Sequence, residues 1–531
     1  MVTLDVELEN VMTQRNLLGS PFPLRGLSLK NRVVISPMCQ YSASDGMAND
    51  WHFAHLARFA LGGAGLVFIE ATAVTPEGRI TAGDLGLWDD RQIPPMRRIV
   101  DFMRSQGVVT GIQLSHAGQK ASSRRPWEGG DRLPETEGGW TPVTVNPDCN
   151  GLDEAGMDAL VVAWEEAAQR ALAAGVEVLE LHCAHGYLLH QFLSPLTNRR
   201  SDAFGGSRSN RMRFPLRVAE ALRRTWPNDR PFLVRVSAVD GMADGLTLDD
   251  TIAFCNSLKA LGVDAIDCSS GGIRGSATAG RPTPPEPLYQ VPYAEAIRAQ
   301  TALPTIAVGL ITNGFQAECI LRSGRADLIA VAREALNNPN WALQAIDELD
   351  DSADFSDWPE QAGWWLERRA RGLPPSNLDT PRVYADELRP GMRFSLEPEL
   401  VREADIIRFA RRFDPQPQHL SARSAQDTLF GELVAPGWYT LSALTGMAVR
   451  ARMLRPPDDY QLGLSINDLR FLKPIRPGET LGLEIEITAT RPSESRPGWS
   501  IVEQHWQGVN GDGEVVVELR PTVMMRNRPA A

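Results

Sequence analysis

The chain has 531 residues, more than one hydrophobic core usually organises, so we expect at least two domains. Its hydrophobic fraction of 43% and charged fraction of 23% are ordinary for a globular protein. The net charge of −12 disfavours nucleic acid as a partner, because duplex binding requires a basic face. The N-terminus lacks the apolar segment of a signal peptide, and no long apolar run follows, so we expect a cytoplasmic chain without membrane contact.

The six cysteines are scattered along the chain, and none forms a Cys-x-x-Cys pair. Their spacing gives no signal of a zinc or cluster site, and we expect no metal centre. In a chain of this length without a secretory signal, reduced thiols are favoured over disulfides.

Between about residues 32 and 336, short apolar segments rich in Val, Ile and Leu alternate with segments of helical periodicity. Strands that are buried on both faces read in this way. Eight of them predict an α/β fold of the (β/α)8 barrel type, and the lack of G-x-G-x-x-G after any strand disfavours a doubly wound sheet. The candidate strands are 32–38, 65–74, 108–116, 176–184, 231–238, 265–271, 305–311 and 328–334.

The composition changes after residue 347. An acidic run, a Trp-rich run (WPEQAGWWLERR) and a Pro-containing run (RGLPPSNLDTP) are typical of a barrel tail and then a linker. We place the barrel at 17–366, a linker at 367–380 and a second domain at 381–531.

The second domain combines helices with strands. Helical periodicity at 402–412 and 437–453 and several antiparallel strand patterns predict an α+β domain. The strand patterns lie at 462–472, 480–490, 499–508 and 514–524.

The barrel's most informative residues follow its strands, where active sites of this fold lie. His182 and His185 are three apart, so on a continuous strand they would point to opposite faces. A turn after His182, which Gly186 would tolerate, would bring both to one site. Two imidazoles that donate hydrogen bonds to one oxygen would polarise a carbonyl conjugated to a C=C bond, and Tyr187 would protonate the α-carbon. A metal site and a purely structural pair are the alternatives.

Two arginines also stand out. Arg235 lies inside an apolar strand, where a guanidinium must meet an anion or polar partner. That partner is either an anionic cofactor or an internal carboxylate. Arg333 and nearby backbone amides lie at the ends of the last two strands, the usual phosphate position in barrels.

Longer motifs support a family resemblance: SPMCQYS (36–42), EATAVTPEGR (70–79), GIQLSHAGQK (111–120) and, above all, LHCAHGYLLHQFLSPLTNRRSDAFGGS (181–207). Together they resemble the Old Yellow Enzyme family, in particular its bacterial branch with a cysteine near the flavin. The resemblance implies FMN held without a covalent bond and reduced by NADPH or NADH. Hydride would then pass to an activated alkene.

The resemblance also implies residue roles. His182 and His185 look like the carbonyl-binding pair, Tyr187 like the proton donor, Cys39 like a thiol that tunes the flavin potential and Tyr41 like a pocket tyrosine. The family usually has Gly where this chain has Ala332. The implied FMN contacts are Ser36, Pro37, Met38, Cys39, Ala71, Gln113, Arg235, Gly309, Ala332 and Arg333.

The second domain carries the run FDPQPQHL (413–420), in which Asp414 and His419 are five apart. This run resembles the D-x-N-P-x-H pattern of MaoC-type hydratases, with Gln416 in place of Asn. LRFLKPIRPGETL (469–481) resembles another signature of that hotdog family. The resemblance implies that Asp414 and His419 position a water and shuttle its proton.

Further features of this domain suit a thioester. Pro436 and Gly437 open the predicted central helix, and backbone amides at this helix start would form an oxyanion hole for its carbonyl. Arg450, Arg452 and Arg455 would bind coenzyme A phosphates or form a solvated basic helix end.

From the two halves we expect a bifunctional enzyme with a small-molecule substrate. An FMN-dependent NAD(P)H ene-reductase would act on an enoyl-CoA, or on an aromatic or alicyclic acyl-CoA, and the hotdog domain would hydrate or dehydrate the same thioester. Two alternatives stay open: an enone or xenobiotic reductase that never meets CoA, and a hotdog domain that only dimerises or docks. We also expect a homo-oligomer.

Overall fold

The computed structural model describes residues 16–147, 151–275, 286–349, 355–372, 384–450 and 462–528. The chain separates into two compact units, Met1–Ala370 and Arg371–Ala531, which we describe one at a time. Within the described ranges, no helix is both long and apolar enough to cross a membrane.

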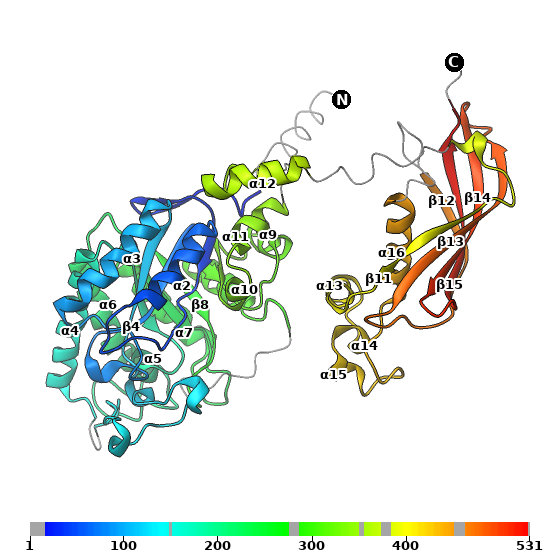
Figure 1. Cartoon of the computed structure of the whole chain (residues 1–531). Coiled ribbons are helices and arrows are strands. Elements are labelled where there is room, and N and C mark those ends of the chain that lie inside the picture. Colours follow the sequence, from blue (N-terminus) through cyan, green and yellow to red (C-terminus); the bar gives the residue numbers. More distant parts are fainter. Residues whose placement is uncertain are drawn as a thin grey trace. The chain divides into compact units, whose positions relative to one another are not determined.

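The first unit is a closed barrel of eight parallel strands, which confirms the predicted fold (Figure 1). Each strand pairs with the next, and β10 closes the ring by pairing with both β9 and β3. The strands are β3 (Val33–Ile35), β4 (Leu66–Ala73), β5 (Val109–Ser115), β6 (Val178–Cys183), β7 (Phe232–Ser237), β8 (Ala265–Ser269), β9 (Thr305–Ala307) and β10 (Leu328–Val331).

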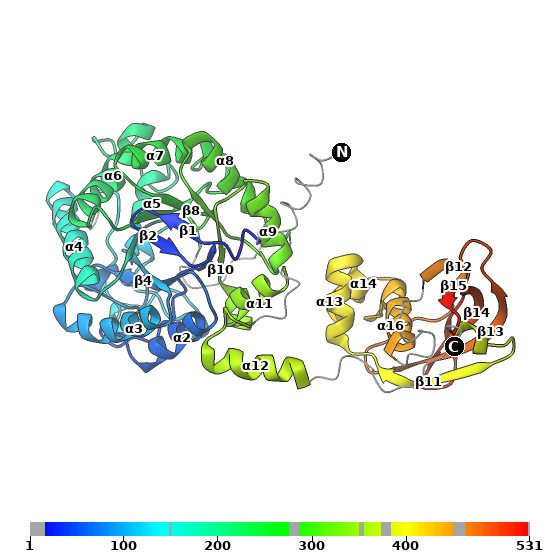
Figure 2. The same cartoon turned by 90° about the horizontal axis from the view of Figure 1, so that it is seen from above.

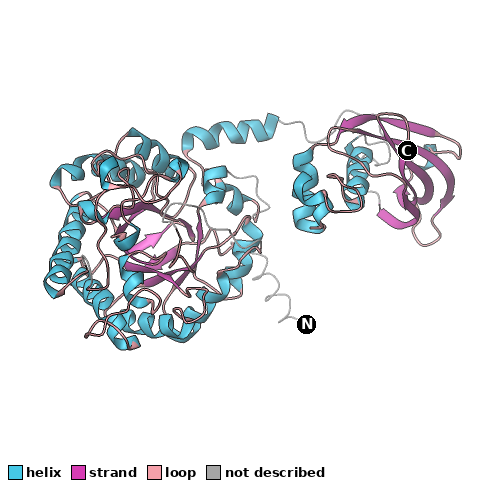
Figure 3. Cartoon of the chain, turned by 90° about the horizontal axis from the view of Figure 1, so that it is seen from below, coloured by secondary structure: helices cyan, strands magenta, loops and turns pink. Residues whose placement is uncertain are grey.

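Helices surround this ring on the outside (Figures 2 and 3). Outward-facing strand residues such as Val67, Leu181 and Val234 share one apolar core with helix residues such as Trp164 and Phe214. This burial on both faces is why the strands read as continuous apolar runs. The helices are α2 (Asp50–Leu61), α3 (Ile93–Ser105), α4 (Glu154–Ala173), α5 (Leu188–Leu193), α6 (Arg208–Thr225), α7 (Leu248–Ala260), α8 (Val291–Thr301), α9 (Gly314–Arg322), α10 (Arg333–Asn337) and α11 (Trp341–Asp347).

An antiparallel hairpin, β1 (Phe22–Leu24) and β2 (Leu27–Leu29), lies over the centre of the ring in Figure 2. Its apolar residues share a second core with inward-facing residues near the start of the strands, among them Leu66, Val178 and Leu233. The hairpin therefore fills the amino end of the barrel, and the polar residues of the interior lie toward the carboxyl end. The sequence reading did not predict this hairpin.

The residues that follow the barrel form a helix. The Trp-rich run predicted as a tail is α12 (Glu360–Gly372), so residues 367–372 of the predicted linker are helical. Residues 373–383 lie outside the described ranges. The domain limits at 17–366 and 381–531 remain a prediction.

The second unit is a five-stranded antiparallel sheet that packs on a helix, consistent with the predicted hotdog fold. The central helix α16 (Gly437–Arg450) contributes Leu444 and Met447 to a core shared with the alternating residues Leu481, Leu483 and Ile485. In order across the sheet the strands are β11 (Arg393–Leu400), β13 (Thr480–Pro492), β14 (Trp499–Asn510), β15 (Val515–Arg526) and β12 (Leu462–Phe471). Three further helices are α13 (Glu403–Phe413), α14 (Pro417–Leu420) and α15 (Ala422–Ala425).

Candidate functional site

A tight turn follows β6 and brings two histidines together. His185 has a φ of 60° and Gly186 a φ of 74°, so the strand conformation ends there. The ring centroids of His182 and His185 lie 5.2 Å apart with nearly perpendicular planes. A Cβ at Gly186 would lie 2.2 Å from the carbonyl oxygen of Gly272, so only glycine fits this position. The structure thus contains the break that a shared site requires.

His182 presents a hydrogen-bond donor at the carboxyl end of the barrel. Burial, with smaller contributions from Arg235 and His190, holds its pKa well below the usual range, so the ring is neutral. Its Nδ1 accepts the N–H of Ala184 at 3.2 Å. A neutral imidazole that accepts at Nδ1 carries its proton on Nε2. The geometry therefore selects the Nε2–H tautomer.

His185 is held by the ends of two neighbouring strands. Its Nε2 lies 2.7 Å from Ser269 Oγ, and its backbone N–H donates to Ser237 Oγ at 2.9 Å. Its carbonyl accepts from Lys120 Nζ at 3.1 Å. Contacts from β7, from β8 and from the loop after β5 therefore fix the position of His185.

Tyr187 lies beside His182, with ring centroids 4.9 Å apart. It belongs to a small apolar cluster against which Cys39 and Tyr41 pack, together with Trp140. Burial is the main reason why the pKa values of the Cys39 thiol and the Tyr41 phenol lie well above their usual ranges, so both stay protonated. The fold thus gathers Cys39, Tyr41 and Tyr187 in one cluster, although Tyr187 is far from the other two in sequence.

The barrel interior below these residues is polar. Gln113 Nε2 donates to Glu180 Oε1 at 2.7 Å, and Arg235 Nε lies 3.3 Å from Asp267 Oδ2. Arg235 therefore has the internal carboxylate that the sequence left open as one alternative. Burial, followed by the nearby Asp267, raises the pKa of Glu180 to about 8. The sequence reading missed Glu180 and Asp267, although each is a lone acid in an apolar strand.

Buried polar atoms that lack a hydrogen bond test whether FMN fits here. Ser36 Oγ and Glu180 Oε2 are buried and make no hydrogen bond, and Arg235 Nε has only its ion-pair contact with Asp267. Buried polar atoms are normally satisfied, so these atoms favour a polar ligand. Ser36 and Arg235 are among the residues implied as FMN contacts, and the polar edge of an isoalloxazine can satisfy them. The residues present therefore fit the cofactor.

The remaining implied FMN contacts occupy the same end of the barrel. Gly309 follows β9 with a φ of 118°, a conformation that favours glycine. Ala332 is the residue before α10, and Arg333 is the first residue of that helix. Ala71 and Gln113 pair across β4 and β5. Pro37, Met38 and Cys39 follow Ser36 after β3.

The second unit contains a separate Asp–His pair. His419 Nδ1 lies 2.8 Å from the carbonyl oxygen of Val434 and must donate to it, because a carbonyl only accepts. Its Nε2 lies 3.7 Å from Asp414 Oδ2. Gln416, which replaces the usual Asn, donates to Asp414 Oδ1 at 2.7 Å. Gly437 is the first residue of α16. The side chain of Arg450 and all of Arg452 and Arg455 lie outside the described parts of the chain.

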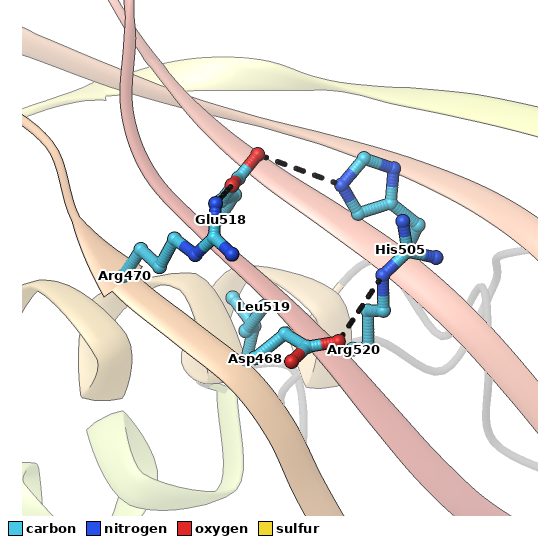
Figure 4. A pocket seen from close by; sticks show the side chains of 6 residues that line it. All are labelled: Asp468, Arg470, His505, Glu518, Leu519 and Arg520. Atoms are coloured by element: carbon cyan, nitrogen blue, oxygen red, sulfur yellow. Dashed lines mark ion pairs between the residues drawn. The ribbon is translucent and has the colours of Figure 1, made fainter.

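A shallow cavity of about 200 Å³ lies elsewhere in this unit, among side chains of β12, β14 and β15 (Figure 4). Its charges neutralise one another: Glu518 lies 3.6 Å from Arg470 and 3.9 Å from His505, and Asp468 lies 3.7 Å from Arg520. We assign no site to it. Nor do the described residues include a group of three His, Cys, Asp or Glu placed to hold a metal ion.

Comparisons with known proteins agree with this geometry. The model of the NADH:flavin oxidoreductase / NADH oxidase family matches residues 18–352, and that of the MaoC like domain matches residues 387–498. An NADPH dehydrogenase of Geobacillus thermodenitrificans is 44% identical over 335 residues, which are 63% of this chain and 94% of that enzyme.

Two solved structures share the barrel fold. A 2-naphthoyl-CoA reductase in complex with 2-naphthoyl-CoA aligns with a TM-score of 0.56 and 20% identity, over 62% of this chain and 52% of that one, so this chain spans about half of its length. Morphinone reductase aligns with a TM-score of 0.52 and 24% identity, over 65% of this chain and 93% of that one. At these identities the likeness establishes the fold alone. The family match and the 44% identical relative go further: the chain belongs to the NADH:flavin oxidoreductase / NADH oxidase family, Old Yellow Enzyme-like enzymes that use FMN with NADPH or NADH, and carries a MaoC-like domain.

Proposed function

We propose that this chain is a bifunctional enzyme whose barrel reduces the activated C=C bond of an enoyl-CoA or related acyl-CoA thioester and whose hotdog domain adds or removes water. One observation supports the barrel reaction above all others. Two imidazoles, one of them a fixed Nε2–H donor, converge with Tyr187 at the end of the barrel that fits FMN.

The barrel residues would act on the substrate carbonyl. His182 Nε2–H and a ring N–H of His185 donate to its oxygen, which draws electron density from the β-carbon. If the Ser269 hydroxyl donates to His185 Nε2, the proton of that ring remains on Nδ1. Bound FMN supplies the hydride that this β-carbon accepts. Tyr187 holds the proton that the α-carbon then takes.

The hotdog residues would act on the same class of compound. His419 donates through Nδ1 to Val434, so its Nε2 carries the lone pair that would take a proton from water, in place of its 3.5 Å contact with Gln418 Nε2. Asp414 lies 3.7 Å away and would orient that water or accept its second hydrogen bond. These roles rest on the resemblance of residues 413–420 to a hydratase motif and on the MaoC-like match.

The thioester substrate is supported by the combination of domains. A conjugated thioester is both an activated alkene and a hydration substrate, and fusion raises the concentration of one site's product at the other. The 2-naphthoyl-CoA reductase shares the barrel fold and carries an aryl-CoA thioester, which makes such a substrate sterically plausible for this architecture.

A second candidate is an enone reductase with a non-catalytic hotdog domain. Gln416 favours it, because the residue differs from the motif's Asn and occupies one oxygen of Asp414. In this candidate the domain would serve only assembly or docking.

Anaerobic incubation of the FMN-loaded chain with NADPH and a short 2-enoyl-CoA tests both activities. We expect mass spectrometry to detect a gain of two hydrogens from reduction and a gain of water from hydration. Reduction of cyclohexenone with an unchanged thioester would instead establish the enone reductase.

A further inference from the structure

The turn at residues 184–187 is held by a buried pair that the proposed reaction does not use. His190 is the third residue of α5, which begins directly after the turn, and Asp240 follows β7. His190 Nε2 and Asp240 Oδ1 are 2.9 Å apart, and both side chains are fully buried. The two atoms meet at ion-pair distance without the alignment of an ideal hydrogen bond.

One backbone contact fixes the tautomer of His190. The N–H of Gly186 donates to His190 Nδ1 at 2.8 Å. A neutral imidazole that accepts at Nδ1 carries its proton on Nε2, the atom that faces the Asp240 carboxylate. The carboxylate, the imidazole and the amide of Gly186 therefore form one continuous chain of polar contacts.

Asp240 is itself firmly anchored. Its Oδ2 accepts the hydroxyl of Ser194 at 2.6 Å and the N–H of Leu246 at 2.7 Å. Burial alone would raise the pKa of Asp240, but contacts from His190, Ser194 and Leu246 outweigh it, and the pKa lies below the usual range. The Asp240 carboxylate, at one end of this series of contacts, thus remains an anion in the interior.

The following peptide unit, which begins at the carbonyl of Gly186, is also held. The carbonyl of Gly186 accepts from Gln191 Nε2 at 2.6 Å. His190 and Gln191 therefore fix the orientation of the residue that lies between His185 and Tyr187. His185 adopts a left-handed backbone conformation, which non-glycine residues keep only when their surroundings impose it.

We propose that His190 and Asp240 are positioning residues that hold Gly186 and so keep the His185 imidazole and the Tyr187 phenol in place for the substrate carbonyl. The proposal rests on the proposed barrel reaction. Supporting groups of this kind matter because a shift of about 1 Å at a reacting group costs a large part of its effect.

The test measures ligand binding in the FMN-loaded full chain. A phenol such as 4-hydroxybenzaldehyde, stacked on an oxidised flavin, gives a long-wavelength charge-transfer band whose titration yields a Kd. Replacing His190 by Leu should raise this Kd about tenfold, the order expected when support of a buried polar contact is lost. The FMN content should remain stoichiometric.

His190→Gln is the matched control, since an amide offers an acceptor to Gly186 and a donor to Asp240. Its Kd should stay within about threefold of the parent, a rescue that a loss of packing alone would not show. A His190→Leu protein that holds FMN and binds the phenol as tightly as the parent would overturn the proposal.

Asp240→Asn covers the case in which His190→Leu fails to fold. It keeps the side-chain size, removes the buried charge, and should raise the phenol Kd about fivefold. An unchanged Kd would refute the proposal. His182→Ala and His185→Ala separate the two levels of inference: if they too leave the Kd unchanged, the proposed barrel site fails, and if they alone raise it, only the positioning role of His190 and Asp240 fails.

Discussion

The proposed sites of the barrel and of the hotdog domain each contain a buried histidine, His182 and His419, and the two rings are fixed in opposite tautomers. His182 accepts a backbone N–H at Nδ1 and so exposes an Nε2–H donor. His419 donates from Nδ1 to a backbone carbonyl and so exposes an Nε2 lone pair. The same side chain suits polarisation of a carbonyl in one domain and proton abstraction in the other. The backbone partner of each ring, which the residue type does not reveal, makes this difference.

The two sites also differ in their support. His182 lies on a barrel strand, and the turn beside it is braced by His190, Asp240 and Gln191. His419 lies on the four-residue helix α14, and the side chain of its partner Asp414 is 22% exposed. The Asp414 carboxylate of the hotdog pair is therefore open to solvent, whereas the His182 ring of the barrel is buried.

The largest expected effect separates the two domains. Asp414→Asn should lower hydration of a 2-enoyl-CoA by about 10²–10⁴-fold, because it removes a group proposed to work with the general base. Reduction of cyclohexenone by NADPH should be unchanged, and steady-state rates of both reactions test this. Asp405→Asn, at a half-exposed position in the first turn of α13, is the matched control. Equal hydration by the Asp414 variant would favour the non-catalytic hotdog domain.

A substitution in the barrel should instead lower the reduction rate and leave hydration unchanged. His182→Ala should slow enone reduction by about 10²–10³-fold, since it removes a preorganised donor to the carbonyl oxygen. The rate constant for reoxidation of the reduced flavin by the enone, measured by stopped flow, reports this step directly. His419→Ala serves as the cross-domain control and should leave that rate constant unchanged. A similar loss in both variants would contradict the assignment of separate sites.

A smaller effect is expected at Gln416. Replacement by Ala removes the 2.7 Å hydrogen bond to Asp414 and should lower hydration about tenfold, the lower end of the range for one hydrogen bond to a charged group. Replacement by Asn restores the residue of the hydratase motif and should keep or raise the hydration rate. If Gln416→Asn abolished hydration, the longer side chain would be essential to this chain's own geometry.

The smallest effect concerns pH. Burial and Arg235 lower the pKa of His182, so acidification through the usual histidine range, near pH 6.5, should not charge this ring. We expect the stopped-flow reoxidation rate constant to show no acid limb from His182 between about pH 6 and 8. An acid limb that is present in the parent and absent in His182→Ala would show that His182 titrates in this range.

The eight barrel strands, the central hotdog helix and the residues at the strand ends could be predicted from the sequence, because their signals are local. A strand that is buried on both faces consists of apolar residues throughout, so its sequence alone reveals it. The turn after His182 could also be inferred, since strand geometry separates two residues three apart and Gly186 permits the required φ.

Other features depend on contacts between residues that are distant in sequence, so they could not be predicted. The β1–β2 hairpin is too short to show a periodic pattern, and its apolar residues pack against the amino end of the barrel. The edge strand β11 alternates Phe394 and Leu396 with polar residues, but it is largely exposed and contains Pro398, which argues against a strand, so it was not predicted. His190 and Asp240 are 50 positions apart, and each is an ordinary polar residue until the fold buries them together. Burial and hydrogen-bond partners come from residues distant in sequence, and they set the tautomers of His182, His190 and His419 on which the chemistry depends.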